Sequence, residues 1–335
     1  MRSIFFSYLM VAFIALICAC SSGDKVKIGF LLPNLSDDRF PKDRDYFTAK
    51  VNELGGEVMV KDAKNNDQEQ IQQANELIAQ GAKVLVIIVV NKNSAAVIVR
   101  NAHAKGVKVI AYERIISNCD LDYFISFDNI KVGELMATYA KKIKTKGKYM
   151  VLCGDKSDQN AIWVKQGQHN IIDPFVNNEN IKVVYETYIE DWSGDNAYFE
   201  VKRFLNLSCN DVPDVILSAY DGMSTGALKA LDEINAKAYP IITGQNAELQ
   251  ACKNIVKGKQ TMTIYKPIKI EAQKAAELAM KCANNEKISL DKTLYNGAVQ
   301  VPSILIEPIS VDVNNMKSTI IADGFLKETD VYGGN

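Results

Sequence analysis

This sequence contains very little histidine and almost no net charge. Only two of its 335 residues are histidine, and 39 Lys and Arg offset 40 Asp and Glu to leave a formal net charge of −1. Without a basic excess the chain has little to neutralise phosphates, so we expect no nucleic-acid partner. So few imidazoles also argue against histidine-driven catalysis and a histidine-based metal site. We therefore expect no enzymatic activity, no metal and no cofactor.

Paired cysteines are missing as well. Two cysteines lie near the N-terminus, and the rest are spread without a CxxC pair or a cluster, which excludes a typical zinc or iron–sulfur site. In an oxidising compartment the five remaining cysteines allow one or two disulfides. At least one thiol then stays free, because five is an odd number. Burial as small apolar residues is the favoured role for these five: Cys119, Cys153, Cys209, Cys252 and Cys282.

The first residues have the pattern of a secretory signal. A positive start at Arg2 precedes an uncharged apolar run from Ile4 to Ile17, whose length of about 14 residues is below the roughly 20 that span a bilayer. A buried helix is the less favoured alternative, since it would carry polar residues on one face.

The run ends in Ile17-Cys18-Ala19-Cys20, which resembles the cleavage site of bacterial lipoproteins. That resemblance implies a signal peptide over residues 1–19 and a lipid on Cys20, which would anchor the folded part to the periplasmic side of a bacterial membrane.

From Lys25 onward, short β-branched runs alternate with longer amphipathic segments. The pattern predicts strands at Val26–Leu32, Glu57–Lys61, Lys83–Val90 and Val107–Tyr112, with helices between them. The alternation then restarts near Lys148. Repeated strand–helix–strand units predict an α/β protein with two doubly wound parallel-sheet lobes.

Polar and aromatic residues follow the ends of these strands. In open parallel sheets, ligands bind beyond the carboxyl ends of the strands, so these residues are candidates for one cleft between the lobes. Planar Asn, Asp and Arg groups bond adjacent hydroxyls, and aromatic faces pack on the C–H face of a sugar ring. Taken singly, residues such as Asp128, Asn160 and Asp221 fit helix caps better than ligands, but together, at strand ends in two lobes, they favour a binding cleft.

Several segments resemble the family of periplasmic D-xylose-binding proteins of bacterial ABC sugar transport. They are Arg39–Asp45, Val84–Ile88, Ile125–Asn129, Lys131–Leu135 and Gln260–Ile268, and the likeness runs from about Lys25 to the C-terminal region. The resemblance implies the periplasmic binding protein type I fold, with discontinuous lobes joined by a three-segment hinge. The N-terminal lobe would hold residues 24–127 and 262–293, and the C-terminal lobe residues 128–261 and 294–335.

The resemblance also implies which residues bind sugar. Carried over residue by residue, the predicted site is Arg39, Phe40, Glu113, Arg114, Asp158, Asn160, Trp192, Tyr220, Asp221, Asn246 and Lys266.

Four positions depart from the family pattern, which has Trp at 40, Asp at 113, Asn at 220 and Asp at 246. Asn246 replaces two acceptor oxygens with one acceptor and one donor and removes a negative charge. These changes bear on which sugar fits, because a buried partner left unpaired costs several kcal/mol.

The leading hypothesis is a monomeric, lipid-anchored solute-binding protein that captures a monosaccharide, D-xylose first among them, and delivers it to an ABC permease. The alternative is a sugar-sensing protein that presents its closed form to a membrane sensor kinase or chemoreceptor.

Overall fold

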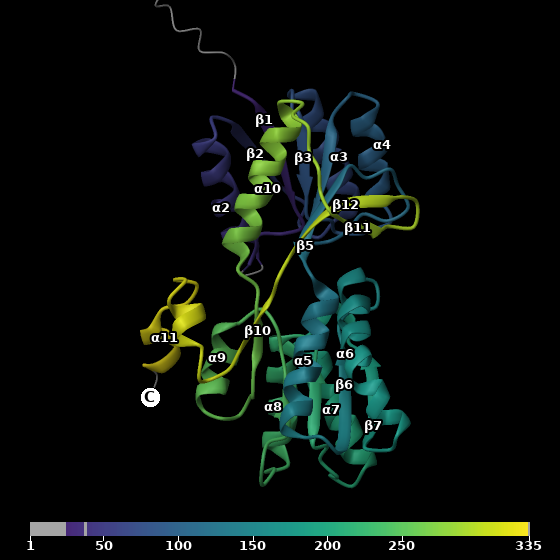
Figure 1. The fold of residues 1–335 in the computed structure, drawn as a ribbon, viewed down its shortest axis with the longest axis vertical. Coiled ribbons are helices and arrows are strands. Elements are labelled where there is room, and N and C mark those ends of the chain that lie inside the picture. Colours follow the sequence, from purple (N-terminus) through teal and green to yellow (C-terminus); the bar gives the residue numbers. More distant parts are fainter. Residues whose placement is uncertain (1–24, 37–38, 334–335) are drawn as a thin grey trace, which may run out of the picture.

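The computed structural model describes residues 25–36 and 39–333. These residues form two α/β lobes stacked one above the other and joined by a narrow waist (Figure 1). The expected class, two doubly wound parallel-sheet lobes, is confirmed. The proposed signal peptide and Cys20 lie outside the described residues. Within the described ranges, no helix combines the length and the apolar character needed to cross a membrane.

The N-terminal lobe contains a sheet whose strands are parallel except for one edge hairpin. In spatial order the strands are β11 (Lys292–Tyr295), β12 (Gln300–Ile306), β5 (Tyr123–Phe127), β4 (Lys108–Tyr112), β3 (Val84–Ile87), β1 (Lys27–Leu32) and β2 (Glu57–Asp62). Only β11 is antiparallel to its neighbour. β3 is buried throughout, as expected of a strand covered on both faces.

Two helices cover each face of this sheet. α2 (Phe40–Glu53) and α10 (Ile268–Ala283) pack on one face, and α3 (Asp67–Ala79) and α4 (Ala96–His103) pack on the other. Because alternate strand residues point to opposite faces, Phe30 joins the α2 and α10 core while Leu31 joins the α3 and α4 core.

The C-terminal lobe repeats the plan on a smaller scale. Its parallel sheet runs β7 (Ile181–Tyr188), β6 (Gly147–Cys153), β8 (Val215–Ser218) and β9 (Ile241–Ile242). α5 (Asn129–Ile143) and α6 (Gln159–Asn177) cover one face, while α7 (Gly194–Leu207) and α8 (Asp221–Glu233) cover the other. The five cysteines of the described residues are all unpaired, and Cys153, Cys252 and Cys282 are buried.

The chain crosses between the lobes three times, which corrects the predicted lobe boundaries. The crossings lie between β5 and α5, between β10 (Thr263–Tyr265) and α10, and between β12 and β13 (Ile309–Val311). Residues 294–306 therefore belong to the N-terminal lobe, because β12 pairs with β5, although the prediction assigned them to the other lobe. Residues 262–265 belong to the C-terminal lobe, because Ile264 bridges Gln245.

After the third crossing the chain stays beside the C-terminal lobe. β13 pairs with β10, and the tail continues through η2 (Lys317–Ile321) and α11 (Glu328–Tyr332). α11 packs against α9 (Leu249–Val256) in a separate small core. This tail reaches the waist, where Phe325 also contacts the core of the N-terminal lobe.

Candidate functional site

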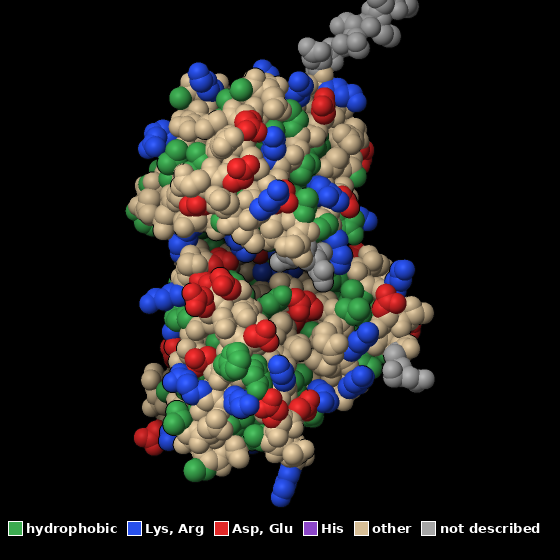
Figure 2. All heavy atoms as spheres, turned by 180° about the vertical axis from the view of Figure 1, so that it is seen from behind, with side chains coloured by type: hydrophobic (Ala, Val, Ile, Leu, Met, Phe, Trp, Pro, Cys, Tyr) green, Lys and Arg blue, Asp and Glu red, His purple; other side chains and the backbone are tan. Residues whose placement is uncertain are grey.

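A cavity of about 270 Å³ lies between the lobes. The waist is hollowed in the space-filling view, and charged side chains gather along it (Figure 2). Every predicted site residue except Asp221 lines this cavity. The residues come from loops after strands of both sheets, because the two sheets point their carboxyl ends at the waist.

Arg39 organises the wall from the N-terminal lobe. Its guanidinium contacts three carboxylates, Asp43 at 3.0 Å, Glu113 at 3.0 Å and Glu271 at 2.6 Å. Asp43 and Glu271 have no exposed surface, and Arg39 is itself largely buried. Such a network is stable only while its charges stay paired, since each ion has lost its hydration.

Burial and charge act in opposite directions on the acids of this wall. Burial alone would raise the pKa of Glu113, but the charges of Arg39 and Lys266 lower it to about 2. Burial and the charge of Glu113 raise the pKa of Glu271 well above its usual range. Burial lowers the pKa of Lys266. Glu113 is therefore ionised at the cavity surface.

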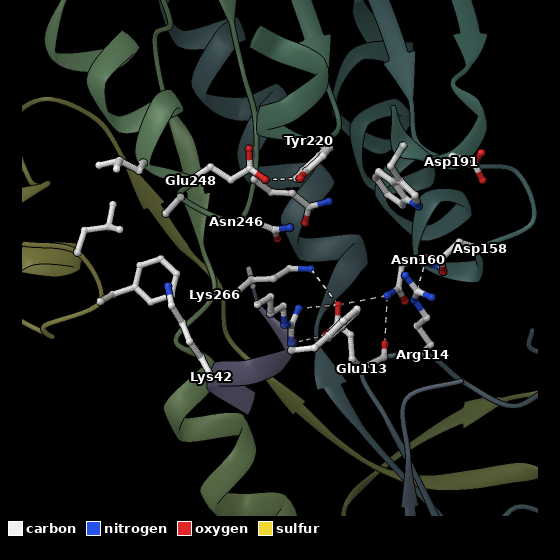
Figure 3. Close-up of a pocket in the computed structure, with 18 residues that line it drawn as sticks. Lys42, Glu113, Arg114, Asp158, Asn160, Asp191, Tyr220, Asn246, Glu248 and Lys266 are labelled. Carbon is white, nitrogen blue, oxygen red and sulfur yellow. Dashed lines mark hydrogen bonds and ion pairs between the residues drawn. The ribbon is translucent and has the colours of Figure 1, made fainter. Parts of the chain in front are cut away.

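Contacts across the cavity join the two lobes at Glu113. The Asn160 amide donates to the Glu113 backbone carbonyl at 3.1 Å and to its carboxylate at 3.4 Å (Figure 3). Lys266, on the second crossing, lies 3.5 Å from the same carboxylate. Arg114 faces Asp158 at 3.7 Å. The side-chain oxygen of Asn160 is buried without a hydrogen-bond partner, so this wall offers an acceptor to a ligand.

Aromatic rings flank the polar groups. Phe40 lies at the start of α2, 6.0 Å from the guanidinium carbon of Arg114, and Trp192 ends the turn η1 (Glu190–Trp192). The indole of Trp192 lies against Gly154, where a Cβ would come within 2.2 Å of the ring. Glycine at this position therefore lets the indole face the cavity.

Several residues that line the cavity have unusual backbone conformations. Glu113, Trp192, Asn246 and Ala247 have φ of 60°, 55°, 91° and 53°. Non-glycine residues adopt this region at a cost, and such outliers cluster at binding sites. The polar Asn246 tolerates it better than most residues.

Asp221 does not line the cavity, which corrects the prediction for this residue. It is fully buried behind Tyr220 and accepts hydrogen bonds from Gln260 at 2.9 Å, Thr263 at 2.8 Å and the Glu248 backbone N–H at 3.0 Å. These bonds tie the loop after β9 to β10 and leave no face of the carboxylate for a ligand. Burial and the charge of Glu248 raise its pKa to about 8.

One motif has the form of a catalytic sequence but not its geometry. Residues 222–226 read Gly-x-Ser-x-Gly, the pattern of a serine nucleophile elbow. Ser224 is buried within α8, and its hydroxyl donates to the Thr243 carbonyl at 2.7 Å. An elbow needs an exposed serine at the turn, so this serine is structural.

The prediction missed some of the cavity residues. The additional lining residues are Lys42, Asp191, Gln245, Ala247, Glu248, Leu249, Phe325 and Leu326. Asp191 and Gln245 are neighbours of predicted residues at strand ends, so the same sequence pattern could have predicted them. Phe325 and Leu326 come from the tail, which no local pattern connects to the site. No group of metal-ligating side chains suited to an ion occurs in residues 25–36 and 39–333.

Comparisons with known proteins match this architecture. A family model described as a periplasmic binding protein domain matches residues 28–287. Over 307 residues the chain is 39% identical to the D-xylose-binding periplasmic proteins of Haemophilus influenzae and Escherichia coli, covering 92% of this chain and 92% and 93% of theirs. It is 27% identical to the multiple sugar-binding periplasmic receptor ChvE of Rhizobium radiobacter, covering 91% and 92%.

Among solved structures, a solute-binding protein of an ABC transporter from Clostridium phytofermentans superposes with a TM-score of 0.85. That protein, solved with bound β-D-glucose, is 27% identical, and the match covers 91% of this chain and 99% of the other.

Proposed function

The chain belongs to the periplasmic binding protein family, and on that premise we propose that it captures D-xylose between its lobes and delivers it to an ABC permease. It is a binding protein and not an enzyme, like the relatives it matches. The proposed ligand class is a neutral monosaccharide, and the proposed location is the periplasm.

The observation that carries this proposal is the composition of the cavity wall. Planar polar groups, among them Arg39, Glu113 and Asn160, converge from both lobes with the rings of Phe40 and Trp192 beside them. Such groups bond neighbouring hydroxyls, and the rings cover the apolar face of a pyranose. A volume of about 270 Å³ is close to the lower limit of roughly 300 Å³ for small-molecule sites, which suits a single sugar ring.

Capture requires that the sugar prefer the closed arrangement of the lobes. Three crossings are short enough to act as a hinge, and ligand contacts from both lobes stabilise the closed state. Asn160 and Glu113 approach each other across the cavity, so a bound sugar would bond both at once.

Anchoring through a lipid on Cys20 is a separate part of the proposal, supported by the sequence of residues 1–20. Mass spectrometry of the protein purified from a bacterial membrane tests it. A diacylated Cys20 at the N-terminus is expected, and Cys20→Ser should release the protein from the membrane. An unmodified Cys20 in the processed wild-type chain would refute the anchor and leave sugar binding untouched.

Sugar sensing, in which the closed form of the protein is presented to a membrane sensor kinase or chemoreceptor, is the second candidate function. It is favoured by the likeness to ChvE, whose name describes a receptor. Affinity purification with D-xylose present distinguishes the two functions: a permease as the co-purified membrane protein supports transport, and a kinase or chemoreceptor supports sensing.

The binding proposal is tested by thermal unfolding of the chain without residues 1–19 against D-xylose, L-arabinose, D-ribose, D-glucose and D-galactose. A ligand at a thousand times its Kd stabilises by about 4 kcal/mol, which raises the midpoint by several degrees. We expect the largest shift with D-xylose. No shift with any sugar would refute sugar binding, and a larger shift with another sugar would replace xylose.

A further inference from the structure

Tyr220 and Glu248 form a hydrogen-bonded pair along one side of the cavity. Tyr220 comes from the loop before α8 and Glu248 from the loop before α9, and the phenol donates to the Glu248 carboxylate. Both side chains line the cavity, and they lie across it from Glu113 (Figure 3). The ring of Trp192 meets the Tyr220 ring edge-on, at 6.3 Å and 90°. Two loops therefore hold one wall of the pocket together.

The backbone beneath the pair fixes the tyrosine in place. The Tyr220 carbonyl accepts from the Ser218 hydroxyl at 3.0 Å and from the Ser224 backbone N–H at 3.0 Å. The ring rests over Gly222, where a Cβ would lie 2.6 Å from it. Any side chain at 222 would push the ring away, so glycine permits the observed position of the phenol.

The partner loop is fixed as well. Glu248 follows Asn246 and Ala247, both of positive φ, and its backbone N–H donates to the buried Asp221. Moving the phenol would break its bond to Glu248 and its contact with Trp192. Contacts within the protein thus hold the pair in place from both loops.

We propose that the pair of Tyr220 and Glu248 makes the site selective for pentoses by filling the space that the hydroxymethyl group of a hexose would need. The inference rests on the proposed function and specifies its ligand class. The pair borders a cavity of only about 270 Å³, and a wall held on several sides yields only at the cost of its bonds. Glu248 also supplies a carboxylate to the side of the pocket where Asn246 supplies only an amide.

D-Xylose and D-glucose are matched probes for this inference, because they differ only in that hydroxymethyl group. We would measure both affinities by titration calorimetry on the wild-type protein and on Tyr220→Ala, Tyr220→Phe and Glu248→Ala. Tyr295→Ala is the matched control, since Tyr295 is 62% exposed on β11. Thermal unfolding establishes that each variant is folded.

The wild-type protein should prefer xylose by about 100-fold, the scale on which a tight pocket discriminates by one small group. Tyr220→Ala should cut this preference to about tenfold or less by binding glucose more tightly. Tyr220→Phe keeps the ring and should keep most of the preference. Glu248→Ala frees the phenol and should give an intermediate value. Tyr295→Ala should match the wild type.

Two results would overturn the inference while sugar binding stands. One is a wild-type protein that binds glucose as tightly as xylose. The other is a Tyr220→Ala variant that weakens both sugars by one factor, since the tyrosine would then be a contact for both and not a barrier to one. Failure of the wild-type protein to bind any sugar is the different result that removes the proposed function itself.

Discussion

The two walls of the cavity are built in different ways. The wall from the N-terminal lobe is a network of buried charges centred on Arg39, with Asp43, Glu113 and Glu271 around it. The wall from the C-terminal lobe has Tyr220 bonded to Glu248, beside Trp192 and Asn246, whose φ angles are positive. Paired buried charges therefore dominate one wall, and turns of positive φ with the bonded pair of Tyr220 and Glu248 form the other.

The difference has consequences for how each wall tolerates change. Removing one member of a charge network leaves its partners buried and unpaired, so both the fold and the site suffer. Changing a side chain on a turn alters the shape of the cavity while the turn persists. We infer that the C-terminal wall is where ligand preference changes at low cost, and the following predictions test this contrast.

The largest effect is expected from Arg39→Ala. The substitution leaves three carboxylates without their cation and should lower the free energy of unfolding by about 3–5 kcal/mol. Binding of D-xylose should be lost because the wall no longer holds together. Urea denaturation and calorimetry measure the two effects.

Arg44→Ala, in the helix α2 that begins just after Arg39, is the control for this variant. Arg44 pairs with Asp45, which is 65% exposed, so the loss should be below about 1 kcal/mol. Equal destabilisation by the two substitutions would contradict the idea that the buried network holds this wall.

Trp192→Ala tests the opposite wall and should affect binding more than folding. Loss of the ring that we propose covers the sugar should raise the Kd for D-xylose about thirtyfold, equal to about 2 kcal/mol. Trp163→Phe is the control, because Trp163 packs on Phe124 outside the cavity and should leave the Kd unchanged. An unchanged Kd in Trp192→Ala would show that the indole does not face the ligand.

The order of strands and helices was predictable because each element carries its own periodicity. The predicted strands at Val26–Leu32 and Val107–Tyr112 are β1 and β4 with one extra residue each, and Glu57–Lys61 is β2 less one residue. Residues that follow strands were also expected to meet at one edge, since parallel sheets present one edge to a neighbouring lobe. Ten of the eleven residues that the family resemblance implied line the cavity, with Asp221 the exception.

The errors arise where position depends on distant parts of the chain. Asp221 follows β8 like a ligand residue, but Gln260 and Thr263, about forty positions away, enclose its carboxylate. β12 looks like any apolar run, and only its pairing with β5 assigns it to the N-terminal lobe. Phe325 joins the cavity through the fold of the whole tail, which no local pattern encodes.

Asp221 gives the C-terminal lobe a dependence on pH. Its pKa is about 8 in the folded protein and about 4 in the unfolded chain. Between these values the folded state holds a proton that the unfolded state has released, so the free energy of unfolding falls as the pH rises, by up to about 1.4 kcal/mol per unit.

Asp221→Asn removes this titration, and the Gln260 amide oxygen, which is buried without a partner, becomes available to the new amide. The free energy of unfolding of the variant should therefore fall less steeply with rising pH than that of the wild type. Urea denaturation repeated from pH 5 to pH 8 measures both slopes. Parallel curves for the two proteins would show that Asp221 is ionised throughout this range.

The smallest effect is expected at Ala247, in the turn that carries Asn246 and Glu248. Its φ of 53° destabilises an L-residue by about 1 kcal/mol, and glycine has no such strain. Ala247→Gly relieves this strain but loses a buried methyl group and adds entropy to the unfolded chain, so the free energy of unfolding should fall by less than about 1 kcal/mol. Ala230→Gly is the matched control, because Ala230 is equally buried but lies inside α8, where glycine costs about 1 kcal/mol more for the helix in addition to the lost methyl group. A smaller loss of stability at Ala247 than at Ala230 would show that the C-terminal wall is held at a backbone cost. Equal losses at the two alanines would mean that the turn is relaxed, and the contrast between the two walls would then lie in their charges alone.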